Sequence, residues 1–123
     1  MTEAEAIEMV NFYASNALNS FSIWVSITFA FLTVAYLAGG KLSQIQIWII
    51  SPLYCITSGT FGLASVVHVQ SFTALTTTHP EYFPAYLWPL PWSLMTQLVL
   101  IGGTLSSLYF MWDVRKSKAE RRL

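Results

Sequence analysis

The amino-acid sequence predicts an all-α fold: an integral membrane bundle of three transmembrane helices, forming a single membrane domain over residues 1–123. Only 10% of the residues are Asp, Glu, Lys or Arg, whereas a soluble domain carries about 25%. Between Met9 and Trp112 the only charged residues are Lys41 and Glu81. A water-soluble chain of this length has a large surface for its volume and cannot keep charge away from so much of it. The 54% of hydrophobic residues are therefore expected to face a bilayer.

The first helix is expected over about residues 3–38. Thr2 and Glu5 have the spacing of a capping box, which places the helix start just after Thr2. The apolar part of this segment is about 21 residues long and covers about 31 Å at about 1.5 Å per residue, close to the thickness of a hydrocarbon core. Gly39 and Gly40 follow, and we expect them to stop the helix in a left-handed backbone conformation.

The second helix is expected over about residues 44–77. Ser43 and Gln46 form a second capping box at its start. Pro52 lies inside this segment, where it removes one backbone donor and crowds the carbonyl of Trp48. We therefore expect the second helix to be kinked near Pro52.

A proline-rich, aromatic outer loop is expected over about residues 78–91. Four prolines in this stretch exclude a regular helix. Its aromatic rings suit the boundary between membrane and water, because they combine an apolar body with a polar edge. A third helix is expected over about residues 92–118.

The Lys and Arg residues orient the bundle. They lie either between the first two helices or after the third, at Lys41, Arg115, Lys116, Lys118, Arg121 and Arg122. With three spans these two segments share one side of the membrane. Because cytoplasmic segments are enriched in Lys and Arg, the N-terminus is expected outside and the C-terminus in the cytoplasm. The same cations are expected to contact lipid headgroups.

Each predicted helix carries one face of small or hydroxylated side chains, which recur at helical spacing. The residues assigned to helix packing, or to the lining of a pore, are Asn19, Ser22, Ser26, Thr33, Ser58, Gly62, Ser65, Gln97, Gly103 and Ser107. Lipid tails are as apolar as leucine, so helices in a bilayer associate through close contact of small residues and through interhelical hydrogen bonds. The amides of Asn19 and Gln97 are the costliest groups to expose to lipid, and we expect both to point inward.

Residues capable of chemistry are few. His68 and His79 are candidates for proton or pH sensing, because imidazole titrates near neutral pH. On one continuous helix they would lie about 16 Å apart along the axis, too far to share a metal ion. His79 and Glu81 alone supply too few ligands for a structural zinc site. The sequence contains no phosphate-binding glycine loop and no nucleophile–base pattern, so no catalytic residue, metal or cofactor is expected.

Residues 32–46 have the sequence Leu-Thr-Val-Ala-Tyr-Leu-Ala-Gly-Gly-Lys-Leu-Ser-Gln-Ile-Gln. This segment resembles one in small uncharacterised three-span membrane proteins of environmental Gram-negative bacteria. In those proteins a first span ends in a tyrosine-containing stretch of small residues, followed by a Gly-Lys-Leu-Ser or Gly-Lys-Leu-Thr turn. The resemblance implies a bacterial inner (cytoplasmic) membrane and carries over no activity.

Three functions are compatible with the sequence. The first is a non-enzymatic membrane protein that assembles through its small-residue helix faces, as a homo-oligomer or as an accessory subunit of a membrane complex. The second is a homo-oligomeric channel or small-solute conduit lined by Asn19, Ser22 and Ser26, and the third is an outward-facing sensor. The expected partners are the lipid bilayer and either a second copy or another membrane protein, with no nucleic acid, since the net charge is zero. An enzyme is not expected, because the segments outside the spans are too short to form a pocket.

Overall fold

The computed structural model of the chain describes residues 1–83 and 91–121. In these ranges it consists of three long α-helices, α1 (Glu3–Ala38), α2 (Gln44–Thr78) and α3 (Trp92–Arg121), and contains no β-strand. Each helix is long and apolar enough to cross a membrane. The predicted all-α class is therefore confirmed, and the chain has the three candidate transmembrane helices of a membrane protein.

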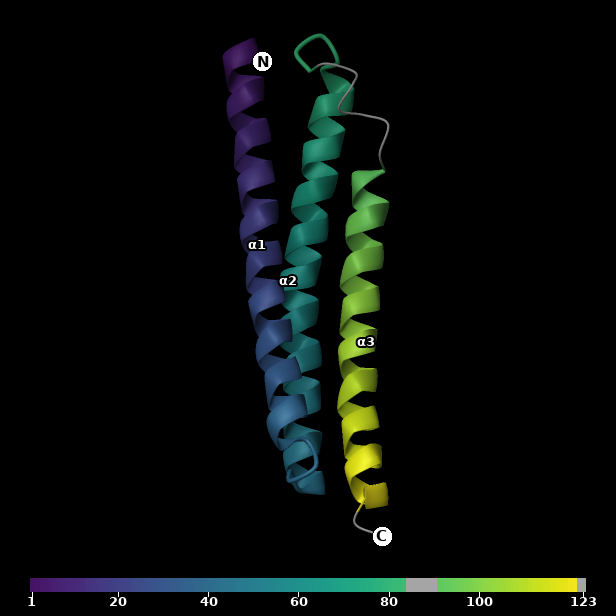
Figure 1. Cartoon of the computed structure of the whole chain (residues 1–123). Coiled ribbons are helices and arrows are strands. Elements are labelled where there is room, and N and C mark those ends of the chain that lie inside the picture. The colour runs from purple at the N-terminus through teal and green to yellow at the C-terminus, as the bar shows by residue number, and fades with distance from the viewer. Residues whose placement is uncertain (84–90, 122–123) are drawn as a thin grey trace.

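The three helices run side by side along most of their length (Figure 1). The N-terminus lies at the same end of the bundle as the last turn of α2. The turn between α1 and α2 lies at the opposite end, beside the end of α3. We call the first the N-terminal end and the second the turn end, which comprises residues 39–43 and the last turns of α3. At the N-terminal end, α1 and α2 continue beyond the first residue of α3.

Both predicted capping boxes are present. At the start of α1 the Thr2 amide donates to the Glu5 carboxylate at 2.8 Å, and the Glu5 amide donates to the Thr2 hydroxyl at 3.2 Å. Ser43 and Gln46 repeat this arrangement at the start of α2, at 2.8 and 3.2 Å. These bonds satisfy amides that have no partner inside the helix, which explains why both helices begin where the sequence places them.

The later helix boundaries differ slightly from expectation. α2 continues through Pro52 and ends at Thr78, one residue beyond the expected end, and α3 ends at Arg121, three residues beyond it. Of the expected proline-rich loop, residues 84–90 lie outside the described residues, and so does Arg122. The kink near Pro52 stays a prediction.

The predicted left-handed stop after α1 is wrong. Gly39 has a φ of −52° and a ψ of −40°, which is right-handed, and no glycine in the described residues has a positive φ. The chain turns instead because the amides of Lys41 and Leu42 both donate to the carbonyl of Ala38, at 2.8 and 3.1 Å. The first of these bonds spans three residues and the second spans four. The helix therefore tightens and ends without a special backbone conformation.

The buried core contains side chains from all three helices. Phe31, Ala35, Tyr54 and Met111 form one cluster. The rings of Phe31 and Tyr54 stack with centroids 4.1 Å apart and planes 11° apart. The hydroxyls of Tyr54 and Thr28 lie 3.1 Å apart, so each polar group in this buried region has a hydrogen-bond partner.

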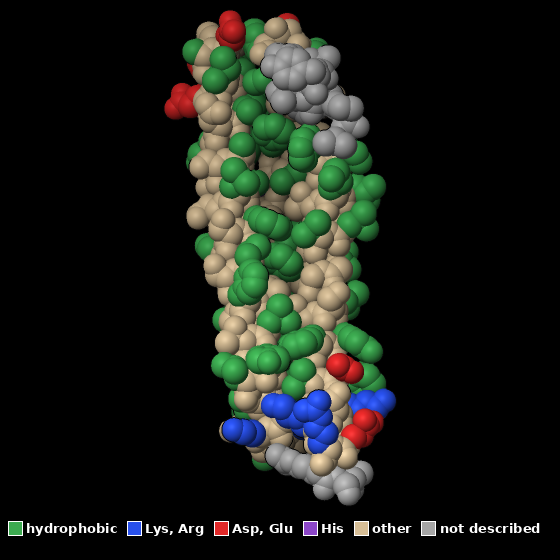
Figure 2. Space-filling model, viewed as in Figure 1, with side chains coloured by type: hydrophobic (Ala, Val, Ile, Leu, Met, Phe, Trp, Pro, Cys, Tyr) green, Lys and Arg blue, Asp and Glu red, His purple; other side chains and the backbone are tan. Residues whose placement is uncertain are grey.

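The outside of the bundle is largely apolar. Large side chains such as Phe29, Leu53, Leu63 and Leu105 are more than half exposed. On the face shown in Figure 2, hydrophobic side chains extend along the whole bundle, while Lys, Arg, Asp and Glu gather at its two ends. A helix bundle in water has the opposite arrangement, with polar residues outside. This surface is suited to hydrocarbon contact.

Candidate functional site

The polar face of α1 lies on the outside of the bundle. All of its members are exposed, and we define the α1 polar face as Ser15, Asn19, Ser22, Ser26 and Thr33. The direction in which this face points follows from its position relative to the buried residues of α1. Ser22 precedes the buried Trp24 by two residues, and Ser26 precedes the buried Thr28 by two residues. Residues two apart lie about 200° apart around a helix, so the α1 polar face points away from α2 and α3.

Asn19 is exposed, which corrects the expectation that it points inward. The inward positions of α1 are occupied by Trp24 and Phe31, whose rings fill the space between the helices. The hydroxyls of Ser26 and Thr33 donate to carbonyls of their own helix, at 2.9 and 2.8 Å. In the described part of the chain, the carboxamide of Asn19 has no such bond. The same holds for the hydroxyls of Ser15 and Ser22. Because an amide has both a donor and an acceptor group to satisfy, Asn19 is the member of the α1 polar face that most needs a partner outside the chain.

The polar faces of α2 and α3, in contrast, turn toward the inside of the bundle. Ser58, Gly62 and Ser65 of α2 are buried, and so is Ser107 of α3. Gln97 is half-buried, and its amide donates to the Ser93 hydroxyl at 3.3 Å. Of the three predicted polar faces, two are therefore used within the chain and one is not.

A hydrogen-bonded chain joins the three helices at one level. The Trp24 indole Nε1 of α1 donates to the Ser58 Oγ of α2 at 2.7 Å. Ser58 Oγ in turn lies 3.0 Å from the Thr104 Oγ1 of α3. In this second bond either hydroxyl can donate, because each carries one proton and two lone pairs. This bond network fixes how α1 and α3 are rotated against α2.

Gly103 is required for the close approach of α1 to α3. A Cβ atom at Gly103 would lie 2.6 Å from Cη2 and 3.0 Å from Cζ2 of Trp24, inside van der Waals contact. At Gly62 an added Cβ would meet only Leu100, at an ordinary 3.7 Å. At Gly59 and Gly102 it would meet no atom within 4 Å. The indole of Trp24 therefore rests directly against the backbone of α3.

Sequence reasoning missed Trp24, Thr28 and Tyr54, which carry the buried interhelical hydrogen bonds. The signal that could have identified the aromatic ones was their position along the predicted spans, away from the membrane boundaries. Aromatic residues with a polar atom are expected at the membrane boundaries, where that atom reaches water. A Trp or Tyr near the middle of a span needs a partner inside the protein. Trp24 and Tyr54 both have one.

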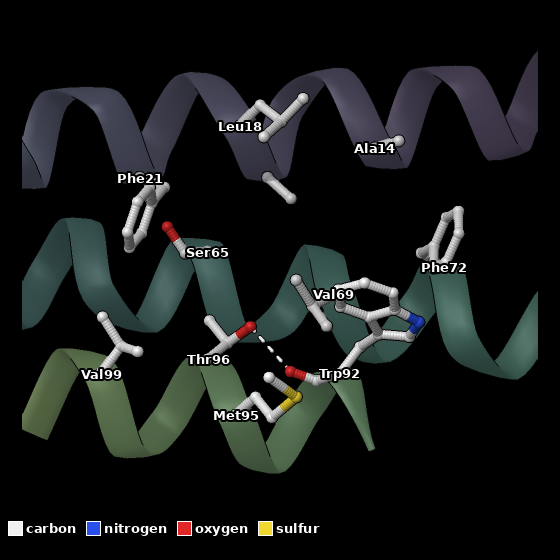
Figure 3. Close-up of a pocket in the computed structure, with 11 residues that line it drawn as sticks. Ala14, Leu18, Phe21, Ser65, Val69, Phe72, Trp92, Met95, Thr96 and Val99 are labelled. Carbon is white, nitrogen blue, oxygen red and sulfur yellow. Dashed lines mark hydrogen bonds between the residues drawn. The ribbon is translucent and has the colours of Figure 1, made fainter. Parts of the chain in front are cut away.

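An apolar groove of about 420 Å³ lies between the helices toward the N-terminal end (Figure 3). Residues from all three helices line it, among them Leu18, Phe21, Val69, Phe72, Met95 and Val99. The Thr96 hydroxyl in its wall is engaged with the Trp92 carbonyl at 2.8 Å. Its lining contains no charged side chain. The groove therefore offers no general acid or base.

His68 and His79 are held by separate partners. His68 Nδ1 donates to the Ala64 carbonyl at 2.6 Å, and its ring centroid lies 6.4 Å from that of Tyr13 on α1. His79 Nδ1 lies 3.2 Å from the Glu81 carboxylate. A hydrogen bond from its own backbone amide, and then His79, lower the pKa of the Glu81 carboxyl. The structure does not bring the two histidines together, and the described residues contain no group of three or more metal-ligating side chains.

The basic residues of the turn end differ in their surroundings. Arg115 Nη1 donates to the carbonyls of Gly39 and Leu42 at 3.1 and 2.9 Å, and its Nη2 donates to Gln44 at 3.3 Å. The ammonium of Lys116 lies 5.1 Å from the centre of the Trp112 ring. Arg115 thus ties α3 to the turn between α1 and α2.

No protein-family model, curated protein or solved structure matches the chain. The resemblance of residues 32–46 to small membrane proteins of Gram-negative bacteria stays a prediction.

Proposed function

We propose that the chain is a non-enzymatic membrane module that assembles through the α1 polar face, either with copies of itself or as an accessory subunit of a larger membrane complex. One observation carries the proposal: this face is polar, exposed, and opposite to the side of α1 that contacts α2 and α3. The proposal places the module in a bacterial inner membrane, with the N-terminus outside and the turn end in the cytoplasm.

The physical reason is the low polarity of the lipid tails. A face that exposes hydroxyls and an amide to hydrocarbon leaves those groups without hydrogen-bond partners, whereas a second helix supplies them. Ser22 and Ser26, four residues apart, are small enough to let another backbone approach closely. Interhelical hydrogen bonds in membranes average about 0.6 kcal/mol each, so several contacts along the face are needed for stable assembly.

A groove next to the α1 polar face provides further contact surface. It has a volume of about 700 Å³ and lies between α1 and α3. Thr33 belongs both to this groove and to the α1 polar face, and the small residues on the α3 side of the groove are Gly103, Ser106 and Ser107. A helix docked on the α1 polar face would have this groove beside it.

The test is the native mass of the protein in mild detergent for the variant Ser26→Leu. Thr60→Leu is the matched control, because Thr60 is exposed as Ser26 is. The hydroxyls of both residues donate to a carbonyl of their own helix, at 2.8 Å from Thr60 to Ile56 and at 2.9 Å from Ser26 to Ser22. We expect Ser26→Leu to reduce the assembly and Thr60→Leu to leave it intact. An unchanged mass for Ser26→Leu contradicts the proposal. Gly103→Leu is unsuitable, since it would displace Trp24 within the chain.

A ring-forming conduit is the second candidate, and the length of the α1 polar face favours it. Thr33 lies 18 residues after Ser15, so the face extends over about 27 Å, nearly the thickness of a hydrocarbon core. Copies arranged with these faces inward would have a neutral lining that includes Asn19, Ser22 and Ser26. A defined oligomer and flux of ions or small solutes across reconstituted membranes are expected. The absence of flux over a range of pH and voltage would leave the assembly proposal as the better one.

A further inference from the structure

The turn end has a basic surface that comes from two separate parts of the chain. A Cβ atom added to Gly40 would overlap the side chain of Lys118, meeting its Cδ first and lying 2.8 Å from its Cβ. The stem of Lys118 therefore lies against Gly40, the residue that precedes Lys41 in the chain. Arg115 anchors the same stretch of α3 through its bonds to the carbonyls of Gly39 and Leu42. We call Lys41, Arg115 and Lys118 the turn cations.

The acidic residues of α3 lie on its other side. Asp113 precedes Arg115 by two residues, and Glu120 follows Lys118 by two residues. Each pair is therefore separated by about 200° around the helix. In the described residues, none of the turn cations has a carboxylate within 4.0 Å. Figure 2 shows Lys and Arg side chains gathered at the turn end, with the nearby acidic side chains to one side.

The start of α2 adds to the positive potential at this place. Its first turn begins at Gln44, immediately after the turn that carries Lys41. The N-terminus of a helix carries the positive end of the peptide dipoles. No acidic residue lies in this first turn to offset it.

We infer that the turn cations form a binding site for the phosphate-bearing headgroup of an anionic phospholipid. Charge complementarity points to an anion, since the turn cations have no carboxylate partner. The position points to a lipid: exposed Trp112 and Tyr109 lie on the neighbouring turns of α3, where amphipathic rings mark a membrane boundary. The site is independent of the assembly proposed for the α1 polar face, which lies on another helix.

The proposed site predicts that Lys116 and Lys118 of α3 contribute differently to lipid binding. Lys116 precedes Lys118 by two residues and so lies on the opposite side of α3, above the Trp112 ring. If the membrane surface attracted all basic residues equally, Lys116 and Lys118 would contribute equally. A binding site formed by the turn cations requires Lys118 and Lys41 for lipid binding and does not require Lys116.

The experiment measures lipid retention by the full chain with native mass spectrometry. The protein is released from detergent micelles containing phosphatidylglycerol, with phosphatidylcholine and inorganic phosphate as separate probes. We expect preferential retention of phosphatidylglycerol, and about a fivefold weaker apparent affinity for each of Lys118→Gln and Lys41→Gln. Lys116→Gln, which removes the same charge from the same helix, is expected to bind as the unchanged protein does.

Three results would overturn the inference. The first is an equal loss of lipid for Lys116→Gln and Lys118→Gln, which means that the attraction is diffuse. The second is equal retention of phosphatidylcholine and phosphatidylglycerol. The third is a phosphate adduct that displaces the lipid, which assigns the site to the free anion. The same spectra report the oligomer mass, so a failure of the assembly proposal is seen separately.

Discussion

Adjacent glycines on α3 provide a sharp test of the helix packing. Gly102 is exposed, and a Cβ atom there would meet nothing within 4 Å. A Cβ atom at Gly103 would lie 2.6 Å from the indole of Trp24. Gly102→Ala and Gly103→Ala make the same chemical change one residue apart, so their difference isolates the contact between α1 and α3.

The expected change in stability follows from two opposing contributions. Alanine is favoured over glycine in a helix by up to about 1 kcal/mol, and both variants gain this. Gly103→Ala also overpacks a filled interface, which costs about 1–3 kcal/mol. We therefore expect Gly103→Ala to be about 1–3 kcal/mol less stable than Gly102→Ala, because the clash applies to one of them alone.

The assay is the free energy of unfolding in mixed micelles, followed by helix content. A double-mutant cycle adds a second readout, since Trp24→Phe removes the part of the ring that a Cβ atom at Gly103 would meet. Trp24→Phe is expected to relieve the strain of Gly103→Ala, giving a coupling of at least about 0.5 kcal/mol. Equal stability of the two alanine variants, or additive effects in the cycle, refutes the proposed packing of Trp24 on the α3 backbone.

Two other substitutions test the bonds between helices by the same unfolding assay. Arg115→Lys keeps the charge but loses the guanidinium group, whose Nη1 bonds two turn carbonyls and whose Nη2 bonds Gln44, and we expect a loss of about 1 kcal/mol of stability. Unchanged stability would mean that Arg115 does not hold α3 to the turn. Ser58→Ala leaves the Trp24 indole without its acceptor and is expected to cost about 1–3 kcal/mol. Ser65→Ala is the control for Ser58→Ala, because the buried Ser65 hydroxyl bonds only to its own helix, and equal costs would contradict the role of Ser58.

The starts of α1 and α2 could be predicted because the responsible interactions are local. Thr2 with Glu5, and Ser43 with Gln46, satisfy the first amides of their helices from three residues away. The membrane class was predictable for a similar reason. Composition and the length of each apolar segment do not depend on how the helices meet.

The conformation of the turn between α1 and α2 was not predictable from its two glycines. Gly39 and Gly40 suggested a left-handed residue, yet Gly39 is right-handed. Gly40 matters through the space that it leaves for the side chain of Lys118, which comes from the far end of the sequence. A glycine required for close approach and a glycine required for its backbone conformation have the same appearance in a sequence.

The sequence alone determined which residues share a helix face, since that follows from the angle between successive residues. Only the tertiary structure decided which way each face points. In a soluble protein the polar face turns toward water, so its direction can be inferred from hydropathy. In a bilayer the lipid and the protein interior are equally apolar, and hydropathy does not orient the helix. The rotation of α1 depends instead on residues far away in the sequence, because Trp24 packs against Gly103 and donates to Ser58. These contacts leave Asn19, Ser22 and Ser26 on the outside of the bundle.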